Sequence, residues 1–278
     1  MWVGIHESTG RLHSDQTGAL PILGKHKEKY LVILFDEDSN FIHAEAVPDL
    51  SGKQLVSATE RGLAFFSTHG SENKIFRLDN QISESVRSLL HKQNITIDVT
   101  PVGQHRRNKA EQAIRTYKNH FIATLAGVDQ ECPLELWPDF LEQIGFTLNL
   151  MRTSPRGSSA WAYLHGPADL NKCPIAPLGI KVVAHVPVKD RTSWDNHGEV
   201  GFYVGRALDH YRCYRVWIVK TKSHRISDCL AWFPVTTQVK TPANGAPLYP
   251  LVPPGFAPLP ADVAPSVVPA HGWKREGG

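Results

Sequence analysis

Apolar residues in the first part of the chain fall into short continuous runs and into helical spacing. Residues 30 to 36 form a nearly unbroken apolar run that is too short for a helix, and residues 41 to 47 partly alternate after a polar turn. Together they predict a β-hairpin. Residues 11 to 17 are the nearest candidate for the third strand that a hairpin needs for stability. Residues 52 to 68 carry apolar side chains on one helical face.

The segments that follow continue an alternation of strands and helices. We predict a strand at 74 to 78, a helix at 83 to 92, a strand at 95 to 100 and a helix at 108 to 125. If the first three strands form an antiparallel meander, a right-handed helical crossover returns the fourth strand parallel to the first and beside it. That pairing would bring Asp15 and Asp79 together at the sheet centre. The expected class is α/β, with a five-stranded mixed sheet flanked by helices.

The second half changes character after two further helices, which we predict at 134 to 151 and 158 to 164. Past residue 174 the pattern predicts short strands at 180 to 186, 200 to 204, 211 to 219 and 225 to 233, which is typical of a small antiparallel β module. Nine of the 30 residues from 241 to 270 are proline, which favours an extended or disordered tail. The expected division is an extension at 1–10, a core at 11–168, a β-rich module at 174–236 and a proline-rich tail at 237–278.

Composition narrows the class of protein. At 278 residues, with 41% apolar and 21% charged residues, the chain can bury one medium domain plus a smaller one. No apolar run approaches the ~20 residues that span a bilayer, so no membrane partner is expected, and the start lacks the pattern of a secretion signal. The cysteines lie far apart without a Cys-x-x-Cys pair, which indicates reduced thiols in a nuclear or cytoplasmic compartment. They are Cys132, Cys173, Cys213 and Cys229.

Net charge is only +3, but basic residues concentrate in one stretch. Between residues 101 and 125 there are five basic residues against the single acid Glu111. The five are Arg106, Arg107, Lys109, Arg115 and Lys118. Such a stripe favours contact with phosphates, although a solvated helix face is the commoner explanation of the same pattern.

Three acids stand at the ends of predicted elements. Asp15 could be a turn residue, Asp79 could cap the following helix, and Glu111, in the first turn of a helix, suits the helix dipole and can pair with Arg115. Each structural role is at least as common as catalysis when taken alone. Together, carboxylates from two adjacent strands and a helix could share two Mg²⁺ or Mn²⁺ ions, because hard cations prefer oxygen ligands and relieve the repulsion among the acids.

Other kinds of site have weaker support. The acidic segment 36–40 opens like a calcium loop, but Phe41 and Val47 occupy the positions that need glycine and a bidentate glutamate, so a hairpin turn is the better interpretation. The histidines show no ligand spacing, and no zinc site is expected. Those considered were His13, His26, His43, His69, His105 and His120. No Gly-x-Ser-x-Gly elbow is present, and Cys132 has no evident base nearby in sequence.

The order and context of the three acids resemble the integrase of copia-type long-terminal-repeat retrotransposons, an RNase H-like polynucleotidyl transferase. His-Ser-Asp-Gln-Thr-Gly at 13–18 resembles the first-aspartate motif of that family, and Leu-Asp-Asn at 78–80 resembles the second. HRRNKAEQAIRTYKNHF at 105–121 resembles the glutamate helix and is the most specific stretch. The resemblance covers residues 11 to 235 approximately.

The resemblance implies an RNase H-like core and metal-dependent DNA strand transfer, in which a 3′-hydroxyl attacks a target phosphodiester. Asp15, Asp79 and Glu111 would be the catalytic metal ligands. The expected partners are element ends and target DNA in the nucleus, with a cytoplasmic stage during assembly and self-association as further expectations. The expected DNA contacts are His105, Arg106, Arg107, Asn108, Lys109, Arg115 and Lys118, of which His105 and Asn108 have an equally good structural role.

Two departures from the family keep an alternative open. The 31 residues between Asp79 and Glu111 are slightly fewer than in retroviral integrases. The paired histidines and cysteines of the family's amino-terminal zinc module do not precede Asp15, which indicates an excised or degenerate piece of a retrotransposon polyprotein. The alternative function is therefore a catalytically silent nucleic-acid-binding or interaction protein derived from an integrase. Hydrolysis in place of joining is a third interpretation that the sequence leaves open.

Overall fold

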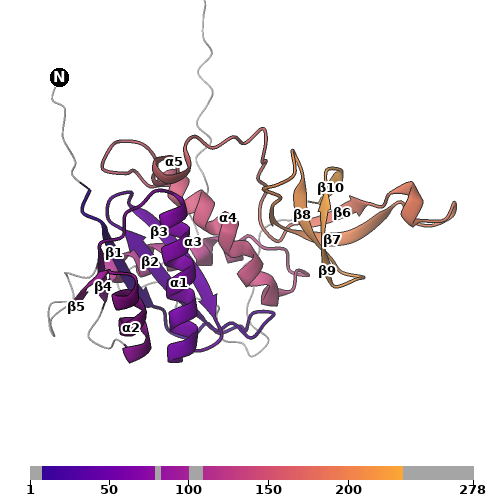
Figure 1. Ribbon diagram of the computed structural model, residues 1–278. Coiled ribbons are helices and arrows are strands. Elements are labelled where there is room, and N and C mark those ends of the chain that lie inside the picture. Colours follow the sequence, from indigo (N-terminus) through magenta and orange to yellow (C-terminus); the bar gives the residue numbers. More distant parts are fainter. Residues whose placement is uncertain (1–7, 79–82, 100–108, 234–278) are drawn as a thin grey trace, which may run out of the picture. The chain divides into compact units, whose positions relative to one another are not determined.

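The computed structural model describes residues 8–78, 83–99 and 109–233 (Figure 1). In this part the chain forms two five-stranded sheets and the helices that pack on them. The strands of the first sheet are β1 (Arg11–Gln16), β2 (Tyr30–Asp36), β3 (Phe41–Val47), β4 (Ile75–Leu78) and β5 (Thr96–Val99). The helices are α1 (Gly52–Thr68), α2 (Glu84–Lys92), α3 (Lys109–Ala126), α4 (Trp137–Met151) and α5 (Ala160–His165).

The first sheet has the strand order β3-β2-β1-β4-β5. Strands β1, β2 and β3 form the expected antiparallel meander, and β4 pairs with β1 in parallel, with His13 opposite Arg77. Strand β5 then pairs with β4 in parallel. The predicted α/β class and the RNase H-like arrangement of the mixed sheet are therefore confirmed. Most elements begin or end within two residues of the predicted bounds.

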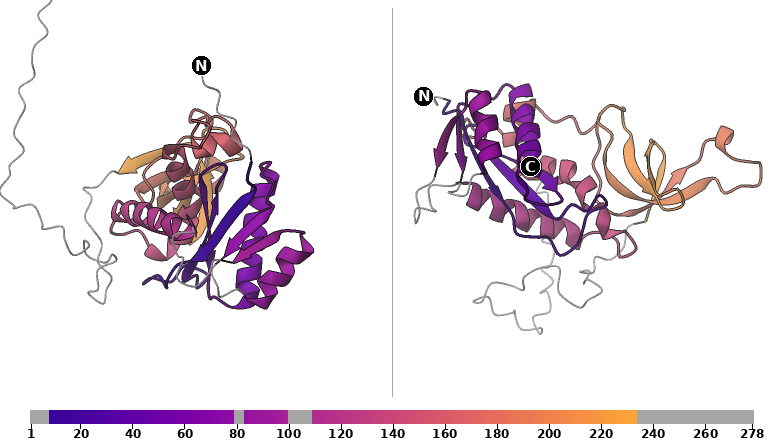
Figure 2. Two further views of the ribbon diagram at one scale, coloured as in Figure 1. Left: turned by 90° about the vertical axis from the view of Figure 1, so that its left-hand side faces the viewer. Right: turned by 60° about the horizontal axis from the view of Figure 1, so that its bottom comes forward.

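Strand β2 divides the core into two faces because successive side chains point to opposite sides of a sheet. Val32 and Leu34 pack with α1 and α2, whereas Ile33 and Phe35 pack with α3 and α4. Figure 2 shows these layers from two further directions. Gly62 lets α1 approach β2 closely, since a Cβ at this position would lie 2.6 Å from a methyl group of Leu34.

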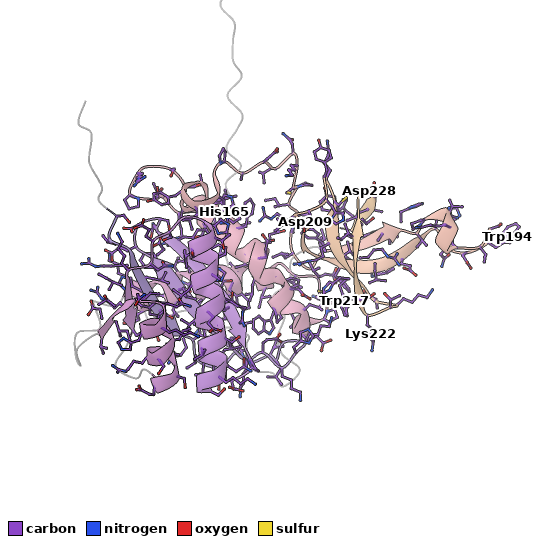
Figure 3. All side chains as sticks on the ribbon, viewed as in Figure 1. His165, Trp194, Asp209, Trp217, Lys222 and Asp228 are labelled. Carbon is purple, nitrogen blue, oxygen red and sulfur yellow. The ribbon has the colours of Figure 1, made fainter. Side chains whose placement is uncertain are left out.

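The second sheet is antiparallel, in the order β10-β6-β7-β8-β9. Its strands are β6 (Lys181–His185), β7 (Gly198–Arg206), β8 (Tyr214–Ile218), β9 (Ser223–Ser227) and β10 (Leu230–Phe233). The prediction of one strand over 225–233 was wrong. The chain turns after Ser227, whose hydroxyl group bonds both polar backbone atoms of Cys229, and β10 then crosses to the opposite edge of the sheet. Trp194, in the connection from β6 to β7, is 98% exposed (Figure 3).

Helix α4 contacts both sheets. The predicted helix at 134–151 begins instead with a 3₁₀ turn, Leu134–Leu136, before α4 starts at Trp137. Trp137, Phe140 and Ile144 belong to one hydrophobic cluster that contains residues of β2 and of β7. The buried hydroxyl group of Tyr203 on β7 donates a hydrogen bond to Gln143 Oε1 on α4 at 2.5 Å. No helix among the described residues is long and apolar enough to cross a membrane.

Candidate active site

Asp15 lies near the end of β1, the middle strand of the first sheet, and is half-buried. It pairs with Ile33 across to β2, and His13, two residues earlier, pairs with Phe35. Ile33 and Phe35 face α3 and α4. Because side chains alternate along a strand and opposite partners share a face, Asp15 and His13 lie on that same face.

Helix α3 covers the sheet face to which Asp15 belongs. Its residues Ala113, Tyr117 and Phe121 are buried in the cluster that contains Ile33 and Phe35. The sequence sets this face through apolar residues that recur every three or four positions. Glu111 lies in the first turn of α3 and is exposed. The structure thus places the helix that carries Glu111 against the strand that carries Asp15.

A buried histidine attaches the start of α3 to β1. The side chain of His13 is fully buried, and its Nδ1 atom accepts a hydrogen bond from the backbone N–H of Lys109 at 3.3 Å. On the other side of the ring, Nε2 lies 3.1 Å from Glu37 Oε2. The other carboxylate oxygen of Glu37 binds Lys109 Nζ at 2.6 Å. His13, Glu37 and Lys109 therefore form a closed network beside Asp15.

The network changes the pKa values of its members. Burial lowers the pKa of His13, and the hydrogen bond with Glu37 only partly offsets this effect. Burial alone would raise the pKa of Glu37, but the hydrogen bonds from Lys109 and His13 outweigh it, so the pKa lies below its usual value. In the sequence, His13 belongs to the motif at 13–18 and Glu37 to the acidic segment at 36–40. Their pairing leaves no local pattern because 24 positions separate them.

The acids between β2 and β3 form a turn, as predicted. Asp36 accepts hydrogen bonds from the backbone and the hydroxyl group of Ser39, and burial raises its pKa. Asp38 accepts the backbone N–H groups of Thr9 and Gly10, at 2.8 Å each. Burial would raise the pKa of Asp38, but these bonds and those from the Ser8 and Thr9 hydroxyl groups lower it. The turn acids therefore fix the chain that leads into β1.

The remaining predicted site residues fall into two groups. Arg115 and Lys118 are exposed on α3, and the ion pair considered between Glu111 and Arg115 is not among the salt bridges of the described residues. Lys109 is the first residue of α3 and binds Glu37. The other candidates lie outside the described residues: Asp79, His105, Arg106, Arg107 and Asn108. Leu78, the residue before Asp79, ends β4 beside β1.

The donor chemistry of the site suits hard divalent cations, which prefer carboxylate oxygens. Asp15 and Glu111 supply such oxygens, from a strand and from the helix packed on it. Among the described residues no group of three or more His, Cys, Asp or Glu side chains is placed to hold a metal ion. A third carboxylate would have to come from outside them, and Asp79 is the candidate in the sequence.

Comparison with known proteins finds similar structures, whereas no protein-family model and no curated protein matches the chain. The catalytic core domain of BIV integrase has a TM-score of 0.42 and 14% identity, over 56% of this chain and 93% of its own. The HTLV-2 integrase catalytic core domain in complex with magnesium, in a dimeric form, has a TM-score of 0.41 and 18% identity, over 56% and 95%.

A third similar structure covers more of the chain. The simian T-cell lymphotropic virus intasome, in complex with PP2A regulatory subunit B56 gamma, gives a TM-score of 0.46 and 14% identity, over 82% of this chain and 79% of that one. At these TM-scores and identities the likeness establishes no family for the chain. A functional assignment therefore depends on the sequence motifs and on the packing of α3 against β1.

Proposed function

We propose that the chain is an integrase-like polynucleotidyl transferase of the copia type, derived from a retrotransposon, that joins DNA with the help of two divalent metal ions. The observation that carries the proposal is the packing of α3 on the face of β1 that holds Asp15. In sequence, Asp15 and Glu111 stand in the two motifs that most resemble those of such integrases. The fold therefore brings β1, which carries Asp15, against α3, which carries Glu111, and the proposed chemistry requires both acids at one site.

Each acid has a proposed role. Asp15, Asp79 and Glu111 would hold two Mg²⁺ or Mn²⁺ ions, which, when bound, neutralise charge on a phosphate and promote ionisation of the attacking hydroxyl group. The assignment of Asp79 follows from its position directly after β4, the parallel neighbour of β1. In the proposed reaction a 3′-oxygen forms a new bond to phosphorus and the bond from phosphorus to the departing 3′-oxygen breaks. The proton of the attacking hydroxyl group passes to solvent, and the departing oxygen takes up a proton from solvent to become a hydroxyl group.

Basic residues would bind the DNA backbone around the acids. Arg115 and Lys118 are exposed on α3, and neither forms a salt bridge among the residues that the structure describes. Both side chains can therefore bind phosphates without breaking such a salt bridge. Arg106 and Arg107 are proposed for the same role from sequence alone, with His105 and Asn108 as further candidates. The proposal includes element ends and target DNA as partners, self-association of the chain, and action in the nucleus, where target DNA is found.

A strand-joining assay with labelled, preprocessed DNA ends and Mg²⁺ or Mn²⁺ tests the proposal. We expect joined products from the unaltered chain and at least a hundredfold loss for Asp15→Asn, Asp79→Asn and Glu111→Gln, because each removes a charged ligand. Glu60→Gln is the matched control, since Glu60 is exposed on α1, which packs on the other face of the sheet. Joining that survives Asp15→Asn would overturn the assignment.

The same assay separates the alternatives. Shortened DNA without joined products would indicate a hydrolytic nuclease that uses water as the nucleophile. DNA binding without either product, unchanged by Asp15→Asn, would indicate a catalytically silent binding protein. Circular dichroism of each variant shows whether a loss of product reflects a loss of fold.

A further inference from the structure

The connection from α4 to α5 holds an arginine at the tip of a hydrogen-bonded turn. The backbone N–H of Gly157 donates to Ser154 O at 3.0 Å, which closes a β-turn with Pro155 and Arg156 at its centre. Proline at the second position and glycine at the fourth favour this turn, and Gly157 has a φ of +84°. A second bond, from Ser154 N to Ser158 O at 2.7 Å, closes the base of the turn.

The same connection is anchored on the β2–β3 turn. Asn40 Nδ2 donates to Thr153 O at 2.8 Å, and Arg152 Nε donates to Asn40 O at 2.8 Å. Arg152 also bonds the side-chain oxygen of Asn40. These partners are neutral, so no acid among them offsets the positive charge of the Arg152 guanidinium group. The turn that presents Arg156 is thus held in place before any ligand arrives.

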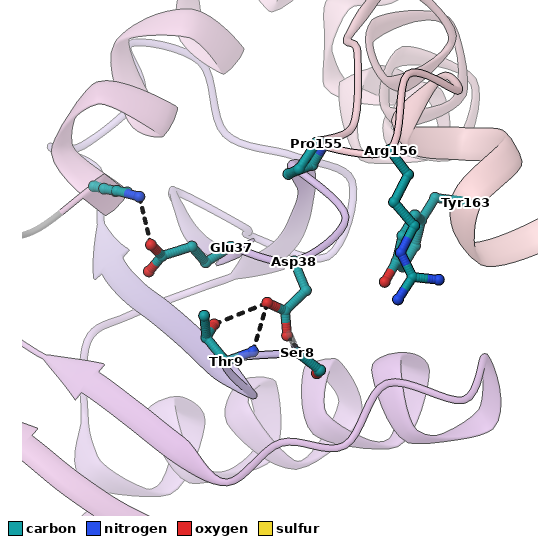
Figure 4. Close-up of a pocket in the computed structure, with 8 residues that line it drawn as sticks. Ser8, Thr9, Glu37, Asp38, Pro155, Arg156 and Tyr163 are labelled. Atoms are coloured by element: carbon teal, nitrogen blue, oxygen red, sulfur yellow. Dashed lines mark hydrogen bonds and ion pairs between the residues drawn. The ribbon is translucent and has the colours of Figure 1, made fainter. Parts of the chain in front are cut away.

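Arg156 faces a polar hollow of about 200 Å³ whose acids already have partners (Figure 4). Both oxygens of Glu37 are engaged by His13 and Lys109, and both oxygens of Asp38 accept bonds from residues 8 to 10. Arg156 lies over the ring of Tyr163, with 5.1 Å from its central carbon to the ring centroid, which is a cation–π contact. It forms no salt bridge with any acid in the described part of the chain. Its N–H groups are therefore available to an external anion.

A second hollow adjoins the first along α3. It measures about 340 Å³ and is lined by Arg152 and by polar residues of α3, namely Gln112 and Thr116. Lys109 lines both hollows. Its backbone also contacts His13, which is two residues, or about 6.6 Å along an extended strand, from Asp15. The two hollows therefore share Lys109 at the start of α3, the helix that carries Glu111.

We propose that Arg152 and Arg156 bind successive phosphodiester groups of a DNA strand that runs along these two hollows. The planar guanidinium fork matches phosphate oxygens, and the cation–π contact with Tyr163 favours one position of the Arg156 side chain before a ligand binds. This site rests on the proposed function for the identity of its ligand, because it adjoins the helix of Glu111. It adds residues to the DNA contacts that the motifs at 105–118 indicate.

Binding of a fluorescent oligonucleotide duplex in EDTA, followed by anisotropy over a range of salt concentrations, tests the site without any chemistry. We expect Arg156→Ala to weaken binding about tenfold at low salt and to reduce the slope of log K against log salt by ~0.9, the value for one phosphate contact. Arg156→Lys should keep the slope, because charge is retained, and bind less tightly. Arg152→Lys tests the second phosphate while keeping the charge beside Asn40.

Arg87→Ala is the control, since Arg87 is a partly exposed arginine of α2, paired with Glu84, and α2 packs on the opposite sheet face. It should leave the slope unchanged. A slope that Arg156→Ala does not alter would overturn the site, even if Asp15-dependent joining is observed. If Arg156→Ala reduces the slope but the unaltered chain joins no DNA, the phosphate site is supported and the proposed chemistry is overturned. Absence of DNA binding by the unaltered chain would overturn both.

Discussion

His13 accepts the first backbone N–H of α3, that of Lys109, on its Nδ1 atom at 3.3 Å. An accepting Nδ1 carries no proton, so in the neutral ring Nε2 holds the proton and donates it to Glu37. The imidazole therefore has one favoured tautomer and one favoured orientation. Through it, the position of the helix that carries Glu111 depends on a residue that is not one of the expected metal ligands.

Replacing this imidazole should loosen the start of α3. We expect His13→Phe to lower the free energy of unfolding by about 1–3 kcal/mol, because the variant leaves the Lys109 N–H and the Glu37 carboxylate without a buried partner. Urea denaturation measures the loss, and hydrogen exchange should be faster at the first amides of α3. His26→Ala, at an exposed histidine, should change stability by less than ~0.5 kcal/mol. Equal losses in both variants would contradict the role of His13.

Histidine burial also predicts the response to acid. Burial lowers the pKa of His13 and of His120, and it lowers that of His165, which stacks on Trp161 and lies near His69, to about 4. The unfolded chain, with histidine pKa values near 6.5, then binds protons before the folded chain does. Stability should be level above pH 6.5 and fall as the pH drops toward 4. Carboxylates with lowered pKa values, such as Glu45, lose their contribution only below about pH 4.5.

Urea midpoints measured between pH 8 and 4 test whether stability begins to fall near pH 6.5, before the carboxylates are protonated. The same measurement on His165→Phe shows how much of that fall comes from His165. Phenylalanine keeps the ring contact with Trp161 but does not titrate. The slope of stability against pH should decrease by less than ~1.4 kcal/mol per pH unit, the limit for one proton, because His165 is partly exposed. An identical slope in the variant would show that other groups control the response.

The hydroxyl group of Tyr203 should stabilise the contact between α4 and the second sheet. Tyr203→Phe leaves Gln143 Oε1 without its donor in a buried position, and we expect a loss of about 1–3 kcal/mol in the free energy of unfolding. Tyr211→Phe alters a side chain that is mostly exposed and should have no measurable effect. Urea denaturation compares the two variants, and a loss below ~0.5 kcal/mol for Tyr203→Phe would contradict the inferred contribution of this hydrogen bond.

Metal binding should stabilise the folded chain independently of turnover. At a Mg²⁺ or Mn²⁺ concentration ten times the Kd, ligation adds about 1.4 kcal/mol to the free energy of unfolding. Thermal unfolding with and without the metal should show a rise in Tm for the unaltered chain and for Glu60→Gln. Asp15→Asn and Glu111→Gln should lose the rise. A rise retained in both of these variants would place the metal elsewhere.

Sequence patterns predicted the first sheet well because its strands are set by local features. The apolar run of β2 and the helical face of α1 gave bounds that match the structure. The prediction of one strand across β9 and β10 was wrong for a physical reason. Apolar and polar residues continue across the turn, but β9 pairs with β8 whereas β10 pairs with β6. A change of partner is a long-range event that local periodicity does not record.

The candidate site was only partly accessible from sequence. Topology correctly predicted β4 as the parallel neighbour of β1, and helical spacing indicated the buried face of α3. The pairing of Glu37 with His13 and the position of Arg156 depend on contacts between distant segments. Asp79 lies outside the described residues, so its role stays a prediction.

Helix α4 has a consequence for how this chain can vary. Its apolar side chains belong to a cluster shared by both sheets, and Gln143 bonds Tyr203 on β7 and the backbone of Ala176. A fragment cut before residue 174 would expose that cluster to water and leave Gln143 without either partner. The five-stranded mixed sheet therefore depends on residues after 174 for its packing and cannot be exchanged between proteins as a separate domain. In sequences descended from this one, substitutions at positions 143 and 203 should occur together.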